Sequence, residues 1–173
     1  MMAEAVLPEP IVTLAEAQAF ARIETNEEEA LVAGMIRSAS ALCEAFLGQA
    51  VIARQFSEQV PASTQWQRLN SLPVRSIDGV TSGNVALPAT AYATDIDSSG
   101  QGWVRIIDPS VTGLIEVIGS AGLALSRNSV PEPVRQGVVR LVSHLFAARD
   151  GEGGQLPAAV TALWRPYRRM RLY

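Results

Sequence analysis

The stretch Pro131–Asp150, PEPVRQGVVRLVSHLFAARD, carries the strongest helix pattern in the sequence. Its apolar residues recur at intervals of three and four, which places them on one stripe of a helix: Val134, Val138, Leu141, Val142 and Leu145. Prolines near the start suit a first helical turn, so we predict a helix over 131–149 with Val130 as the N-cap and Pro131 as the first helical residue. A stripe of this width needs an apolar partner surface elsewhere in the chain.

Two further helices are predicted before it. Thr13 and Glu16 have the spacing of a capping box, which predicts a helix over 13–23. A longer helix over 27–47 follows, capped by Thr25-Asn26, with acidic residues in its first turn and Gly48 as its C-cap. Its small residues allow close packing against the 131–149 helix. We expect its apolar face to consist of Leu31, Met35, Leu42, Ala45 and Phe46, widened by Ile36 and Ala39.

Between residues 51 and 125 the pattern changes to short strands separated by polar turns. The clearest strand pair is Trp103–Ile107 and Gly113–Ile118, joined by Asp108-Pro109-Ser110. The predicted fold class is therefore α+β and helix-dominated. It consists of an antiparallel helical bundle with a small, mostly antiparallel β-sheet insertion over 51–125 and an extended C-terminal tail.

The length, net charge and cysteine content of the sequence restrict the class of protein. A chain of 173 residues suits one domain with a real core, and a net charge of -3 gives no global attraction to nucleic acid. All the basic residues are arginine. Cys43 is the single cysteine, so no internal disulfide forms and a reducing compartment is expected. We expect neither a secretory signal nor a membrane-spanning segment.

Residues that could carry chemistry do not form a recognisable constellation. One histidine, His144, and one cysteine cannot build a zinc site of the usual kind, nor a Cys–His pair unless the fold brings them together. Glu27-Glu28-Glu29 point in different directions on a helix and compensate its dipole. Asp95, Asp97 and Asp108 lie among turn residues without the spacing of a calcium loop. We therefore predict no catalytic residue, no metal site, no cofactor and no enzymatic activity.

The C-terminal tail, residues 164–173, combines arginine with large apolar side chains, a composition typical of binding hot spots. Contact with nucleic acid, contact with an acidic and partly apolar protein groove, and folding back onto the chain's own domain all stay open. The candidate site residues are Trp164, Arg165, Tyr167, Arg168, Arg169, Arg171 and Tyr173.

The order of these elements resembles the head–tail connector (adaptor) proteins of long-tailed phages and gene transfer agents. The resemblance spans nearly the whole chain and rests on a succession of short motifs rather than on one signature. These are Thr13-Leu-Ala-Glu-Ala17, Asn26-Glu-Glu-Glu-Ala-Leu31, Phe46-Leu-Gly48, Leu72-Pro-Val-Arg-Ser-Ile77, the Tyr92 strand, Val130-Pro-Glu-Pro-Val-Arg-Gln136, the helix with His144 and Arg149, and Leu163-Trp-Arg-Pro-Tyr-Arg168.

The resemblance implies a single connector domain over 1–163 and a docking tail over 164–173. It implies a ring of about twelve copies seated on the portal protein, extending the DNA channel at the head–tail junction of a particle assembled in the bacterial cytoplasm. The ring would present a platform to the next neck or tail component, a stopper or a tail terminator. The tail would bind the portal. DNA would pass without sequence-specific binding, and the near-neutral to acidic charge would let it slide.

An alternative from another class is a DNA- or RNA-binding accessory protein that uses the arginine-rich tail. Its affinity would fall steeply with salt, whereas docking into a protein groove with buried aromatic rings would fall less.

Overall fold

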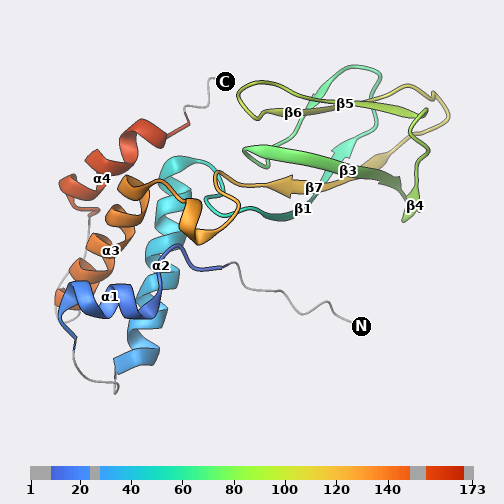
Figure 1. The fold of residues 1–173 in the computed structure, drawn as a ribbon. Helices are drawn as coiled ribbons and strands as arrows, with labels where there is room; N and C mark the ends of the chain where they lie inside the picture. Colours follow the sequence, from blue (N-terminus) through green and yellow to red (C-terminus); the bar gives the residue numbers. More distant parts are fainter. Residues whose placement is uncertain (1–8, 24–27, 149–154, 170–173) are drawn as a thin grey trace. The chain divides into compact units, whose positions relative to one another are not determined.

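The computed structural model describes residues 9–23, 28–148 and 155–169. The chain divides into two compact units, one formed by residues 1–52 with 124–173 and the other by residues 53–123 (Figure 1). Two backbone contacts join the segments by which the chain leaves the first unit and returns to it. Ala124 N–H donates to the Val51 carbonyl at 2.8 Å, and Ile52 forms a parallel β-bridge with Ala124.

The first unit contains four α-helices among its described residues: α1 (Leu14–Ala21), α2 (Glu29–Leu47), α3 (Glu132–Ala147) and α4 (Ala158–Trp164). Short 3-10 turns, η2 (Arg127–Ser129) and η3 (Arg165–Tyr167), precede α3 and follow α4. Helix α3 contacts each of the other three helices. The stretch that carries the strongest sequence pattern is therefore the centre of this unit.

Local chemistry sets the helix ends. The capping box of α1 forms as predicted, with Glu16 N–H donating to Thr13 Oγ1 at 3.1 Å and Thr13 N–H donating to Glu16 Oε2 at 2.7 Å. Gly48 ends α2 with φ of 68°, where a glycine avoids the cost of a side chain. Helix α3 begins one residue later than predicted, with Pro131 as its N-cap. The predicted cap of α2 at Thr25-Asn26 lies outside the described residues.

The predicted apolar face of α2 is only partly correct: Ile36 and Ala39 are buried and Met35 and Phe46 pack against the core, but Leu31, Leu42 and Ala45 are exposed. The residues of α2 buried in the helical core are Val32, Ile36, Ala39, Cys43 and Leu47, whereas Leu31 and Leu42 are 45% and 42% exposed. Apolar residues surround most of this helix, so periodicity did not identify the side that packs. By length and composition alone, α2 is also the one helix in the described part of the chain that is apolar enough to cross a membrane.

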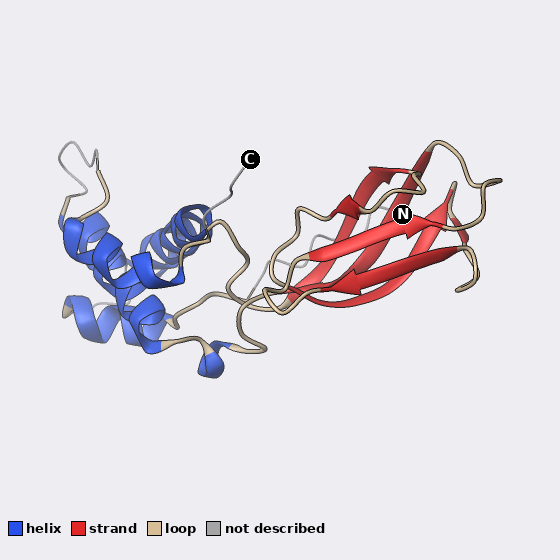
Figure 2. Cartoon of the chain, turned by 90° about the horizontal axis from the view of Figure 1, so that it is seen from above, coloured by secondary structure: helices blue, strands red, loops and turns tan. Residues whose placement is uncertain are grey.

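The second unit holds seven strands in two antiparallel sheets (Figure 2). One sheet has the order β1 (Arg54–Pro61), β7 (Leu114–Ala121), β3 (Val74–Ser82), β4 (Val85–Ala86). The other has the order β2 (Gln67–Arg68), β6 (Gly102–Ile106), β5 (Tyr92–Ile96). Side chains from both sheets meet in a separate core: Val60, Leu69, Val74, Val80, Val104, Ile106, Ile115 and Val117.

These sheets correct the predicted fold class. Strands hold 27% of the structure against 38% for helices, so the protein is a sheet-rich α+β fold and not a helical bundle with a small sheet. The predicted hairpin across Asp108-Pro109-Ser110 is also wrong. Strands β6 and β7 belong to different sheets, so this turn connects the two layers. A turn signal shows where the chain changes direction, but it does not show which strand the next segment will pair with.

Candidate functional site: the C-terminal segment

The C-terminal segment begins with α4, whose last residue, Trp164, is fully buried in the helical core. Its indole Nε1–H donates to the Val134 carbonyl of α3 at 3.1 Å. Gly137 makes room for the ring, because a Cβ added there would lie 2.0 Å from Nε1. The ring also packs against Phe46 of α2, with centroids 5.8 Å apart. Trp164 therefore anchors the segment to α2 and α3, and its side chain is not free to contact a partner.

After Trp164 the chain follows the C-terminal end of α2. Gln49 Nε2 donates to the Tyr167 carbonyl at 2.8 Å, and Arg169 N–H donates to the Leu47 carbonyl at 2.9 Å. The Arg168 guanidinium lies 5.3 Å from the centroid of the Phe46 ring. The predicted alternative of folding back onto the chain's own domain thus applies to residues 164–169.

The exposed groups of this segment are mainly cationic. Arg165 and Arg168 are exposed, whereas Tyr167 and Arg169 are half-buried. Within the described residues, no carboxylate forms an ion pair with Arg165, Arg168 or Arg169. Arg168 and the backbone of Arg169 lie at the C-terminal end of α2, the negative end of its dipole. The other two predicted site residues, Arg171 and Tyr173, lie outside the described residues.

Two of the candidate carboxylates, Asp97 and Asp108, have structural partners. Asp97 accepts hydrogen bonds from the side chain of Ser99 and the backbone of Gln101, and these bonds lower the pKa of its carboxyl. Asp108 is held in the same way by Ser110, which lowers its pKa as well. Both carboxyls therefore fix turns of the sheet unit.

The single cysteine and histidine lie in different environments. Cys43 is buried in the helical core, and desolvation raises the pKa of its thiol. His144 is exposed on α3. No group of three or more His, Cys, Asp or Glu suited to a metal ion occurs in the described ranges.

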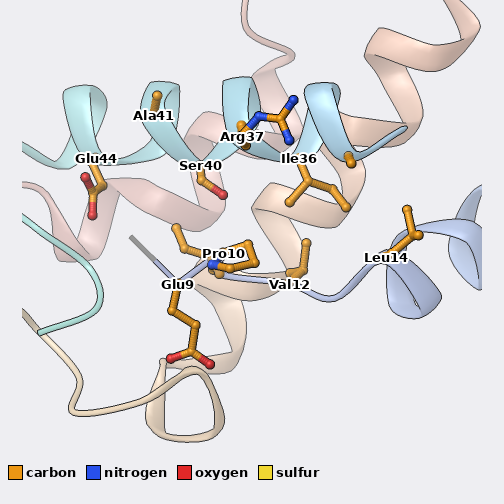
Figure 3. Close-up of a pocket in the computed structure, with 11 residues that line it drawn as sticks. Glu9, Pro10, Val12, Leu14, Ile36, Arg37, Ser40, Ala41 and Glu44 are labelled. Atoms are coloured by element: carbon orange, nitrogen blue, oxygen red, sulfur yellow. The ribbon is translucent and has the colours of Figure 1, made fainter. Parts of the chain in front are cut away.

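A groove of about 450 Å³ runs between residues 9–14 and α2 (Figure 3). Its two carboxylates are engaged, because Glu9 pairs with Arg127 at 2.8 Å and Glu44 accepts the Val51 N–H at 2.8 Å. The Ser40 hydroxyl in its wall has no hydrogen-bond partner among the residues that the structure describes. No nucleophile–base pair lines the groove, so the described residues give it no recognisable catalytic arrangement.

Chains from three solved structures are similar in fold to this chain. A chain from a structure described as the neck of an empty gene transfer agent (GTA) particle computed with C6 symmetry matches with 22% identity and a TM-score of 0.75. A chain from a structure described as the neck of a native GTA particle computed with C12 symmetry matches with 20% identity and a TM-score of 0.68. A chain from the virion of a native gene transfer agent particle matches with 21% identity and a TM-score of 0.74. Each match covers 100% of this chain and 98% of the other.

Among curated proteins, no significant sequence match is found. The family model described as "head completion protein" matches residues 10–155, which include the helices α1, α2 and α3 and all seven strands. The chain therefore belongs to the head completion protein family.

Proposed function

We propose that this chain is a structural, non-enzymatic head–tail connector in the neck of a tailed phage or gene transfer agent particle. The observation that carries the proposal is the family match over residues 10–155, and the likeness of the whole fold to chains from neck structures supports it. Copies form a ring of about twelve on the portal protein, assembled in the bacterial cytoplasm. The ring extends the DNA channel without sequence-specific binding and presents a platform to the next neck or tail component.

The C-terminal segment is the proposed portal-docking element. Its exposed and half-buried side chains combine a tyrosine ring with guanidinium groups that form no ion pair within the described residues, a composition suited to an acidic and partly apolar groove. Trp164 contributes by anchoring the segment to the helical core. The residues proposed to contact the portal are Arg165, Tyr167, Arg168 and Arg169, together with Arg171 and Tyr173.

The test is a pull-down of the cognate portal protein by the full chain, by an Arg165→Glu/Arg168→Glu variant, and by a chain that ends at Arg169. Ending the chain before Trp164 would remove a core residue and confuse docking with folding. Arg140→Glu is the matched control, since Arg140 is an exposed arginine on α3 of the same unit. We expect the full chain and the control to retain the portal, and the charge-reversed and shortened chains to retain at least about tenfold less.

The same experiment at low and high salt, with DNA as a competitor, separates this function from nucleic-acid binding. Portal retention that survives DNA and moderate salt supports the connector. The opposite pattern, DNA binding that collapses with salt and no retention of the portal, would replace the connector with a nucleic-acid-binding protein.

A further inference from the structure

Four side chains on the outer surface of the three-stranded sheet alternate tryptophan with arginine. Arg68 of β2 stands opposite Trp103 of β6. Trp66, directly before β2, contacts Arg105 of β6, whose guanidinium carbon lies 4.9 Å from the centre of the ring. Val104 is fully buried in the sheet core, so its two neighbours in β6 point to the other side of the sheet. We name these four residues the Trp–Arg face: Trp66, Arg68, Trp103 and Arg105.

The packing of the sheet unit leaves this face open. Trp66 is 42% exposed, and both arginines are exposed as well, whereas Trp103 is half-buried. A tryptophan that served only to stabilise the fold would be covered, as Trp164 is in the helical core. Two of the three tryptophans of the chain and two of the four arginines in residues 53–123 meet here. Tryptophan and arginine are the residue types most enriched at binding hot spots, so the face has the composition of a binding surface.

Both guanidinium groups are held in place, and no carboxylate forms an ion pair with either of them within the described residues. Arg68 Nε–H donates to Gln101 Oε1 at 2.6 Å. Gln101 is buried and fixed in turn, because its Nε2 donates to two backbone carbonyls at 2.7 and 3.0 Å. Arg105 lies over the Trp66 ring. Arginines that are oriented before binding lose less entropy when an anion binds, so the face is prepared for an anionic group.

The surroundings favour the carboxylates of a protein over the phosphates of a nucleic acid. Residues 53–123 contain six acidic residues against four arginines, so the sheet unit has no field that attracts a polyanion. Asp95 of β5 is exposed and stands opposite Trp103 on the same face, where it would repel a phosphate backbone that continued past β6. Bases stack on free aromatic rings, whereas one side of the Trp66 ring already carries the Arg105 guanidinium.

We propose that the Trp–Arg face binds a short acidic segment of another protein, with carboxylates on Arg68 and Arg105 and an apolar side chain on Trp66. The sheet order β2-β6-β5 places Asp95 at the edge opposite β2, so the segment lies over β2 and β6 and stops before β5. Every residue of the face lies in the sheet unit, so this inference does not depend on the C-terminal docking segment. It gives the sheet unit a binding role of its own.

The test selects ligands from a phage-displayed library of random peptides, with the full chain as bait and a Trp66→Ala/Arg105→Glu variant as the subtracted control. Neither side chain belongs to the core, so the variant should melt at the temperature of the unchanged chain. We expect the peptides that only the unchanged chain retains to carry aspartate or glutamate beside a large apolar residue. Failure to find such peptides, or a set that is basic or uncharged, overturns the proposal.

Calorimetric titration of one selected peptide then measures the contribution of each arginine. Arg68→Glu and Arg105→Glu should each weaken binding at least about tenfold, because like charges would meet. Arg75→Glu is the matched control, since Arg75 is an exposed arginine on β3 of the same unit, and it should leave the affinity within about twofold.

Two further measurements compare the other possible occupants of the face. Oligothymidylate that binds more tightly than the peptide and is lost in the same variants would assign the face to nucleic acid. Self-association that is lost in these variants, without any face-dependent peptide, would assign it to a second copy of the chain. Either result overturns the proposal. Portal retention is measured separately, so the connector function and the Trp–Arg face can fail independently.

Discussion

Replacing Gly137 with alanine should destabilise this protein, although the same change in a helix interior usually stabilises. Alanine is favoured over glycine in a helix by about 1 kcal/mol. At this position, however, the new Cβ would lie 2.0 Å from Trp164 Nε1 and 2.7 Å from Cδ1 and Cε2. Overpacking a core costs about 1–3 kcal/mol, and loss of the Trp164–Val134 hydrogen bond leaves a buried donor that costs about 1–3 kcal/mol more. The net expectation is a loss of about 1–5 kcal/mol in the free energy of unfolding.

The assay is urea and thermal denaturation followed by circular dichroism at 222 nm, a signal that the helical unit dominates. Gly34→Ala is the matched control, because its new Cβ would meet only Arg37 Nη2 at 3.7 Å, an ordinary contact. That variant should gain up to about 1 kcal/mol. In a Trp164→Leu background the penalty of Gly137→Ala should shrink, since the clashing ring is gone. If Gly137→Ala stabilises as much as Gly34→Ala does, the close packing of Trp164 against α3 is refuted.

Three further outcomes follow from particular groups. The hydrogen bond from the N-cap backbone and the charge of Arg135 lower the pKa of Glu16 in the folded chain. The stabilisation that the ionised Glu16 gives the folded chain is therefore present above about pH 4.5, the unfolded value, and is lost as the pH falls through the lowered folded pKa. Glu16→Gln should flatten the dependence of melting temperature on pH in that acidic range. Burial raises the pKa of Cys43, so iodoacetamide at about pH 8 should label it only when urea unfolds the helical unit; rapid labelling of the native chain would contradict the burial. Gly119→Ala should destabilise the sheet unit by about 2 kcal/mol or more, because the new Cβ would lie 2.2 Å from a β3 carbonyl oxygen. The control is Gly79→Ala, whose new Cβ would meet nothing within 4 Å, so this variant should be tolerated in the same denaturation assay.

Sequence alone determined the features that depend on local chemistry. The capping box at Thr13, the αL glycine at Gly48 and the buried stripe of α3 follow from residue types at fixed spacing. The resemblance to connector proteins rested on the order of these local elements, and the family match supports it. Arginine and aromatic residues near the C-terminus also indicate the candidate docking segment from the sequence alone.

Tertiary structure decided which surfaces meet. Helix α2 is apolar on several sides, so only its packing against α3 showed that Val32 and Cys43 face the core while Leu31 and Leu42 face outward. Trp164 is a residue type typical of binding surfaces, yet its ring is buried against α3 in the space that Gly137 leaves. The turn at residues 108–110 was visible in the sequence, but the pairing of β6 and β7 with different partners was not. Spacing along a chain sets local geometry, whereas strand pairing and helix facing depend on residues far away in sequence, which no local pattern encodes.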